Sequence, residues 1–240
     1  MKRYILYFLL GLILISSLAI GFLFLPFWQI SEVIVEGYQI LSPSKIIEMA
    51  NIPKGENIIF INLSHARKKL KEVIQIKEFS IFRRLPGIIV IKIKERKPLA
   101  VAVIEGQSAV IDEEGIILSS TESPTAEALI QALDATGLPV ITGLKKTSVK
   151  NNRLDPEITC AIELFKFLPS SKLQLEMGKI EDISLLVDDV LKVRLGEPKE
   201  IGEKMRVFRT LLPVIQGRWN EVEYVDVRFL NNPVVKFKRL

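Results

Sequence analysis

The chain has few of the residues that catalysis and metal binding usually need. Its 240 residues include one cysteine, Cys160, and one histidine, His65. One cysteine excludes an intrachain disulfide, and one histidine excludes Ser-His-Asp and Cys-His arrangements unless His65 itself serves. No glycine-rich phosphate loop is present either. We therefore predict a protein that is not an enzyme and has no cofactor, no metal and no small-molecule substrate.

The remaining candidates for chemistry have simpler interpretations. His65 lies among basic residues on a predicted helix and reads as a surface side chain. Cys160 follows the apolar rhythm of "ITCAIELFKFL" and reads as a buried, inert thiol. The acidic residues 112–114 fall in a predicted turn, where charged residues are common. No serine and lysine stand out as a dyad, although a membrane-anchored hydrolase of that kind stays open as an alternative.

Residues 4–28 carry no charge, and a helix of that length covers a hydrocarbon core of about 30 Å. A cleavable signal peptide is the alternative, but its apolar core is normally about 7–15 residues long. We therefore predict an uncleaved transmembrane anchor, with the lipid bilayer as the partner of residues 4–28. Lys2 and Arg3 precede it, and Glu32 and Glu36 follow it, so the positive-inside rule predicts a single-pass type II topology. Residues 1–3 would be cytoplasmic, and everything from Gln29 onward extracytoplasmic.

The net charge of +5 and the basic runs at 67–71 and 91–97 raise the question of nucleic acid binding. The predicted topology argues against it. Outside the membrane, a basic face meets anionic lipid head groups or keeps the domain soluble.

Residues 29–97 have the pattern of a compact α+β module in the order β-α-α-β-β. "ISEVIVEG" alternates as a half-buried strand that ends at Gly37. Ser42 suits the cap and Pro43 the first position of a first helix. A second helix is predicted from Asn62 or Ser64, with Val73 and Ile74 on its inner face.

Two strands, "IKEFSIFRR" and "IIVIKIKERK", then follow around a Leu-Pro-Gly turn. Ile89, Ile91 and Ile93 are expected on the inner face of the second of these strands. Two helices packed on one face of a three-stranded sheet would bury the apolar inner faces of all these elements.

Residues 98–240 are predicted to form a second, mixed α and β domain. Turns are expected at residues 105–106, 114–115 and 188–189, between short strands. One helix is expected over about 155–168. Another is expected over 200–212, with Lys204 on its outer face and Pro213 limiting its extent.

The chain closes with a hairpin around an Asn-Asn turn. Val225, Val227 and Phe229 are expected on one side of its first strand. If the last strand lies at a sheet edge, its outer N–H and C=O groups are free to accept a strand from another protein, since nothing later in the sequence covers them. The other interpretation is that Pro233 and the charges of Lys236, Lys238 and Arg239 blunt the edge against pairing.

Several motifs resemble the FtsQ/DivIB bacterial cell-division family. A short N-terminus and an anchor precede "VIVEGYQILSPSKIIEMANIPKGENIIFINL" and "FRRLPGIIVIKIKERKPLAVA", which resemble the POTRA domain of that family and the entry to its next domain. "VIDEEGIIL", "LPVITG", "VRLG" and "YVDVRF" are similar to its β domain in the same order. The resemblance covers nearly the whole chain.

The resemblance implies a divisome scaffold of the inner membrane, enriched at the septum, that recruits FtsB-type and FtsL-type subunits. It implies the domains 1–3 (cytoplasmic tail), 4–28 (transmembrane helix), 29–97 (POTRA) and 98–240 (β domain). An FtsB-type partner would add a strand to the last strand. The implied contact residues are Arg228, as partner of an acidic group, Phe229, Val234, Val235, Lys236, and Phe237 as an aromatic anchor.

The alternative from the transport class is a POTRA-containing protein that handles polypeptides in outer-membrane assembly or secretion. Such proteins usually continue into a barrel of at least about eight strands with an outward apolar band. The sequence after Pro98 mixes helices and strands instead, which favours the division role.

Overall fold

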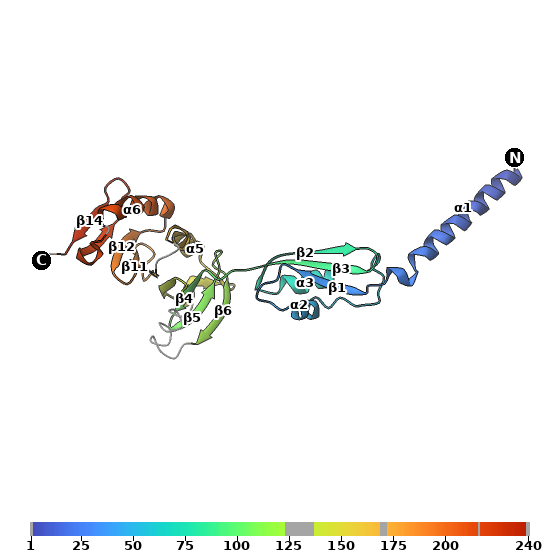
Figure 1. Cartoon of the computed structure of the whole chain (residues 1–240), viewed down its shortest axis with the longest axis horizontal. Helices are drawn as coiled ribbons and strands as arrows, with labels where there is room; N and C mark the ends of the chain where they lie inside the picture. Colours follow the sequence, from blue (N-terminus) through green and yellow to red (C-terminus); the bar gives the residue numbers. More distant parts are fainter. Residues whose placement is uncertain (1, 123–136, 169–171, 216, 239–240) are drawn as a thin grey trace. The chain divides into compact units, whose positions relative to one another are not determined.

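The computed structural model describes residues 2–122, 137–168, 172–215 and 217–238. The chain divides into two compact units, Met1–Arg96 and Lys97–Leu240 (Figure 1).

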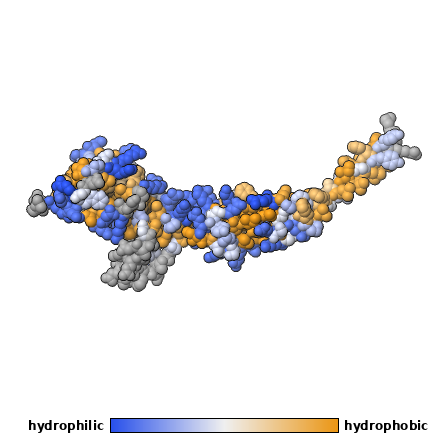
Figure 2. Space-filling view, viewed as in Figure 1, coloured by the Kyte–Doolittle hydropathy of each residue, from blue (hydrophilic) through white to orange (hydrophobic). Residues whose placement is uncertain are grey.

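The first unit begins with helix α1, Lys2–Leu23. Tyr4–Leu23 is the one helical segment of the described residues that is long and apolar enough to cross a membrane, with a mean hydropathy of 2.5. Its side chains are exposed, and the space-filling view shows a largely hydrophobic surface along it (Figure 2). By length and composition, this segment is suited to lipid on all sides. The short 3₁₀ helix η1, Pro26–Trp28, follows.

Three strands of the first unit form a sheet: β1 (Glu32–Glu36), β2 (Ile76–Arg84) and β3 (Ile88–Glu95). The order is β1-β3-β2, with β1 parallel and β2 antiparallel to β3. Two helices lie between β1 and β2 in the sequence: α2 (Pro43–Ala50) and α3 (Ser64–Lys71). The predicted order β-α-α-β-β is confirmed.

The helices and one face of this sheet share a single core. Ile46 of α2 and Leu70 of α3 are fully buried together with Ile89 and Ile91 of β3. Lys92 on the opposite face is exposed. The predicted alternation of β3 is therefore confirmed, and it explains why both helices cover the same face.

The beginning of α2 follows the predicted capping pattern, whereas the end of α3 does not follow the predicted stripe. The Ser42 hydroxyl accepts a hydrogen bond from the Lys45 N–H at 3.3 Å. The expectation that α3 includes Val73 and Ile74 is wrong, because the helix ends at Lys71 and Ile74 is exposed. The Val73 N–H donates to the Leu70 carbonyl in a tight turn that leads into β2, so the helical repeat stops there.

Glu95, at the end of β3, is a buried carboxylate that holds the segment before α2. Its Oε1 accepts hydrogen bonds from the Gln39 and Leu41 N–H groups at 2.9 and 3.0 Å, and its Oε2 accepts one from the Ile40 N–H at 2.8 Å. Burial raises the pKa of Glu95, but these three donors outweigh that effect and hold the pKa below its ordinary value.

The second unit is built on a nine-stranded sheet. Its strands are β4 (Ala100–Ile104), β5 (Gln107–Ile111), β6 (Ile117–Glu122), β7 (Val140–Leu144), β10 (Leu173–Glu176), β11 (Ile183–Val187), β12 (Leu191–Gly196), β13 (Val222–Asp226) and β14 (Val234–Phe237). The order is β14-β13-β12-β11-β10-β7-β4-β5-β6. The pairs β4–β7, β7–β10 and β12–β13 are parallel, and the others are antiparallel.

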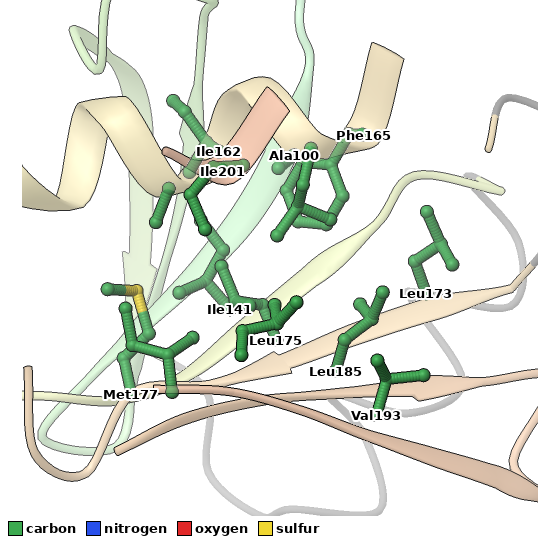
Figure 3. Packing of buried hydrophobic residues seen from close by; sticks show 14 of the residues in the cluster. Ala100, Ile141, Ile162, Phe165, Leu173, Leu175, Met177, Leu185, Val193 and Ile201 are labelled. Carbon is green, nitrogen blue, oxygen red and sulfur yellow. The ribbon is translucent and has the colours of Figure 1, made fainter. Parts of the chain in front are cut away.

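The described residues of this unit also form smaller elements and two helices. They are β8 (Val149–Lys150) and β9 (Arg153–Leu154), the helices α5 (Pro156–Ile162) and α6 (Ile201–Ile215), and the 3₁₀ helices η2 (Lys146–Ser148), η3 (Glu163–Phe167) and η4 (Trp219–Glu221). Ile162 and Ile201 from the helices pack over Ile141 and Leu175 of the sheet (Figure 3). One core therefore joins the helices to the strands, and the predicted mixed fold class is confirmed.

The prediction that Lys204 lies on the outer face of α6 is wrong. It is 5% exposed, and its Nζ donates hydrogen bonds to the carbonyls of Leu195 at 2.8 Å and Glu197 at 2.7 Å. Burial lowers the pKa of this ammonium group. The carbonyls at the end of β12 need donors, and the long lysine side chain supplies them. Pro213 lies inside the last turn of α6, and the helix ends at Ile215.

The prediction that Cys160 is a buried thiol is wrong, because the residue is exposed. In α5 the buried residues are Ile158, Ala161 and Ile162. These form one stripe of the helix, and Cys160 points away from it. The apolar rhythm of the sequence was genuine, but Cys160 did not belong to the buried stripe.

Candidate partner-binding edge

The last strand lies at one end of the nine-stranded sheet. β14 pairs with β13 in antiparallel register, with Val225 opposite Val235 and Asp226 opposite Val234. Among the described residues, no strand pairs with the other side of β14. We call this side, facing away from β13, the open edge. The expectation of a terminal edge strand is confirmed.

The direction of the backbone groups follows from one hydrogen bond. The Lys238 N–H donates to the Glu221 carbonyl at 2.7 Å, so Lys238 faces β13. Because successive residues of a strand direct their N–H and C=O groups to opposite sides, Val235 and Phe237 direct theirs to the open edge. Pro233 lies two residues before Val235, so by the same alternation it faces the open edge and not β13. Its missing N–H therefore removes no hydrogen bond with β13.

The side chains of β14 are divided between the core and the solvent. Val235 is half-buried and packs against the core of the second unit. Phe237 is 37% exposed, with the Arg218 guanidinium 4.9 Å from its ring centre, and Val234 is 45% exposed. The Lys236 Nζ lies 3.0 Å from Glu223 Oε2, in an ion pair with the neighbouring strand.

Arg228 is held by an acidic group of its own chain. Its Nη2 donates to Asp226 Oδ2 at 2.7 Å, and its Nε donates to Oδ1 of the same carboxylate at 3.0 Å. Burial raises the pKa of Asp226, but the bonds and charge of Arg228, with the charge of Arg194, hold it below its ordinary value. An acidic partner would therefore have to share Arg228 with Asp226.

Phe229 is not placed as predicted. Val225 and Val227 are fully buried, but Phe229 is 69% exposed. β13 ends at Asp226, so the two-residue alternation does not extend to Phe229. This makes Phe229 an apolar side chain on the surface next to Arg228, whose guanidinium carbon lies 5.9 Å from the ring centre.

Two cationic neighbours of the hairpin were not anticipated from the sequence. The Arg194 guanidinium, on β12, stacks over the Tyr224 ring at 4.2 Å. Arg218 donates to Glu221 Oε2 at 2.6 and 2.8 Å while lying over Phe237. The parallel β12–β13 pairing creates the first contact, and no local sequence signal reports such a pairing.

The other candidate sites have structural roles. Asp112 Oδ1 accepts hydrogen bonds from the Glu114 and Ile116 N–H groups at 2.9 and 2.8 Å, as expected for a turn. The described residues contain no group of three or more His, Cys, Asp or Glu side chains arranged to hold a metal ion. His65 is exposed on α3.

These features define a protein with an apolar N-terminal helix, a small α+β unit and a second unit that ends in an open sheet edge. Residues 28–96 match the family described as POTRA domain, FtsQ-type, and residues 100–228 match that described as cell division protein FtsQ/DivIB, C-terminal. The chain belongs to the FtsQ/DivIB family of cell division proteins, a non-enzymatic family, and this membership supports a role in the divisome. The second match includes Arg228 but ends before Phe229 and β14.

Curated relatives carry corresponding names. The cell division protein DivIB of Clostridium acetobutylicum is 27% identical over 225 residues, which are 90% of this chain and 85% of that protein. The cell division protein FtsQ of Corynebacterium glutamicum is 22% identical over 87% of this chain and 89% of its own length. The FtsQ protein of Rickettsia bellii is 39% identical over 97 residues, but these are 40% of this chain and 36% of that protein.

Proposed function

We propose that this protein is a division scaffold that recruits FtsB-type and FtsL-type subunits, and that an FtsB-type partner adds a β-strand to the open edge. The observation that carries the proposal is the terminal position of β14, which pairs with β13 alone in the described part of the chain. Strand addition uses such an edge because backbone hydrogen bonds supply affinity and alternate side chains supply specificity.

The side chains beside the open edge support an apolar partner strand. Val234 and Phe237 are exposed at the two ends of β14, and Phe229 is exposed in the connection before it. These residues, with Arg228, Val235 and Lys236, form the proposed contact surface. An incoming strand would cover Val234 and Phe237 on opposite faces of the extended sheet.

The charges near β14 do not by themselves block pairing. Lys236, the charge inside the strand, is paired with Glu223 of β13. An ion pair within the hairpin leaves less free charge at the edge than an isolated lysine does. Lys238, the second proposed edge charge, is exposed just after the end of β14, and Arg239, the third, lies outside the described residues.

The proposal includes a topology and a set of domains. Residues 1–3 would lie in the cytoplasm, 4–28 in the inner membrane, and the domains 29–97 and 98–240 outside the cytoplasm at the septum. Lys2 and Arg3 before the apolar segment support this orientation through the positive-inside rule.

The test is binding of the full-length chain in lipid nanodiscs to the extracytoplasmic segment of an FtsB-type protein. Phe237→Pro removes an N–H of the open edge, whereas Phe237→Ala removes only the ring. We expect Phe237→Pro to weaken binding at least about tenfold, and more than Phe237→Ala does, because a lost bond leaves a partner carbonyl unsatisfied. Arg228→Glu should also weaken binding, and Phe82→Ala, at an exposed site of β2, is the matched control.

Amide hydrogen exchange then locates the contact. The Val235 and Phe237 amides should become protected only in the complex, while Lys236 and Lys238 should be protected in the free protein as well. Tight binding with unchanged exchange at Val235 and Phe237 would place the partner elsewhere and reject strand addition at this edge.

A further inference from the structure

The end of α1 is fastened to the folded part of the first unit. The Asn57 side-chain amide donates a hydrogen bond to the Leu23 carbonyl at 2.6 Å, and the Trp28 indole N–H donates to the Phe22 carbonyl at 2.9 Å. These carbonyls belong to the last turn of α1, where the helix itself supplies no donor, and the Phe22 carbonyl also accepts the Leu25 N–H at 3.3 Å. Side chains of the unit therefore cap the helix end.

The backbone after α1 is also paired with a loop of the unit. The Ile58 N–H donates to the Trp28 carbonyl at 2.8 Å, and the Ile30 N–H donates to the Glu56 carbonyl at 2.8 Å. Gln29 bridges to Asn57 between them. The segment that follows the helix is thus held in place along its length, and the loop at 55–60 has a fixed position beside the helix end.

Exposed apolar side chains gather at this junction. Phe24 and Phe60 stack with ring centres 5.4 Å apart, and both are more than half exposed. Phe27, also exposed, packs edge-on against the half-buried Trp28, with ring centres 5.2 Å apart. Leu85 is exposed in the turn between β2 and β3. We call Phe24, Phe27, Trp28, Phe60 and Leu85 the apolar collar.

Leu85 belongs to the collar because its turn lies against the segment after α1. The Ser31 N–H donates to the Gly87 carbonyl at 2.8 Å. A Cβ added at Gly87 would lie 2.5 Å from the Gln29 carbonyl oxygen, so the turn and the segment are in direct contact. Three separate parts of the sequence therefore bring apolar groups to the same end of the unit.

The position of the collar relative to α1 indicates its partner. Tyr4–Leu23 contains 20 residues, and at about 1.5 Å per residue it spans roughly the hydrocarbon thickness of a bilayer. The collar begins at the next residue, at the depth where tryptophan and other aromatic residues are enriched. Lys54 and Glu56 in the neighbouring loop are both exposed and have opposite charges, and Arg84, next to Leu85, is paired with Glu36 at 3.5 Å. Since these charges offset one another, we take apolar burial as the attraction.

We propose that the apolar collar docks the first unit onto the bilayer, with Phe60 and Leu85 in the interfacial layer of phospholipid at the end of α1. The proposal rests on α1 spanning the membrane. It gives Phe60 and Leu85, which lie far from the anchor in the sequence, a direct contact with lipid. The first unit would then stand on the membrane in a defined orientation.

The test uses nitroxide labels on the full-length chain in phosphatidylcholine vesicles. The labelled variants are Phe60→Cys, Leu85→Cys and Tyr38→Cys, each combined with Cys160→Ser. Tyr38 is the matched control, because it is 48% exposed against 55% for Phe60 but follows the other end of β1. Leu14→Cys, in the middle of α1, reports on the anchor.

Collisions of each label with oxygen, which concentrates in lipid, and with a water-soluble nickel chelate measure its environment. We expect the ratio of oxygen to nickel collisions to be several-fold higher at positions 60 and 85 than at 38, and highest at 14. A ratio at 60 and 85 equal to that at 38, with a lipid signal at 14, overturns the proposal while the anchor stands. Water exposure at 14 as well would overturn both.

Shielding of positions 60 and 85 from both reagents would indicate a protein contact instead, and this too would overturn the proposal. Positions 60 and 85 lie in different loops, so a local distortion in one labelled variant leaves the other informative. Circular dichroism of each labelled chain checks that its folded content is unchanged.

Discussion

Replacing Glu95 by glutamine is expected to destabilise the first unit by about 2–4 kcal/mol. The carboxylate is 8% exposed and accepts three backbone N–H groups, those of Gln39, Ile40 and Leu41. Glutamine preserves the shape of the side chain but turns one acceptor oxygen into a donor. The substitution therefore tests hydrogen bonding and charge rather than packing.

The magnitude follows from the bonds that change. A hydrogen bond to a charged group contributes about 1.5–3 kcal/mol and a neutral one about 1 kcal/mol. If the amide oxygen replaces Oε1, it keeps neutral bonds to Gln39 and Leu41, and the new NH₂ group faces the Ile40 N–H. The charged hydrogen bond from Ile40 is lost, and those from Gln39 and Leu41 become weaker neutral bonds. Glutamine also removes the cost of burying a charge, and this offsets part of the lost stability.

The difference between the two proteins should depend on pH. The pKa of Glu95 is lowered in the folded state, so its contribution is complete above the unfolded value, about 4.3, and disappears as the pH falls through the folded value. Near pH 7, wild type should therefore exceed Glu95→Gln in stability by the full amount. The gap should narrow as the pH falls below about 4.3.

Hydrogen exchange followed by mass spectrometry is the appropriate assay, because a chain with two units does not unfold as a single two-state system. Peptides covering 38–42 should exchange faster in Glu95→Gln, and those of the second unit should not change. Glu78→Gln is the control: its ion pair with Lys94 has both side chains more than 60% exposed and should contribute at most about 1 kcal/mol. Equal protection of 38–42 in Glu95→Gln and wild type at pH 7 would refute the reasoning.

Further predictions concern single residues of both units. Lys204→Met should destabilise the second unit by about 1–3 kcal/mol in hydrogen exchange, because two carbonyls lose their donor, whereas Arg206→Met on the same helix should change it by less than about 0.5 kcal/mol. Gly37→Ala should destabilise the first unit by at least about 1–2 kcal/mol, because Gly37 has φ +85° and an added Cβ would meet the Ile93 carbonyl; a variant as stable as wild type by the same measurement would contradict this. Cys160 should react with a maleimide in the native protein within minutes, and a reaction that requires denaturant would be inconsistent with its exposure.

Much of the first unit was predictable because its signals are local. Ser42 and Pro43 mark the start of α2, and Gly37 marks the end of β1, through the conformations that these residue types favour. Ile89 and Ile91 face the core because a strand alternates its side chains. Each of these features depends on neighbours within a few positions in the sequence.

The errors fall where the end of a helix or strand decides. Lys204 is buried because its Nζ donates to the carbonyls of Leu195 and Glu197 where β12 ends, and Phe229 is exposed because β13 ends before it. The sheet order was beyond sequence reasoning as well, since the β4–β7 and β12–β13 pairs join strands separated by long segments. For the candidate edge, the pattern predicted the hairpin, but only the sheet order places β14 at the end.

Pro233 limits the registers in which a partner strand could pair with the open edge. On that side of β14 the available N–H donors are those of Val235 and Phe237, because proline has none. A partner strand displaced by two residues toward Pro233 would keep its side chains on the same faces but would meet a position without a donor. In the proposed strand addition, the edge would thus distinguish the aligned partner from the slipped one by backbone hydrogen bonding, before any side chain of the partner is compared.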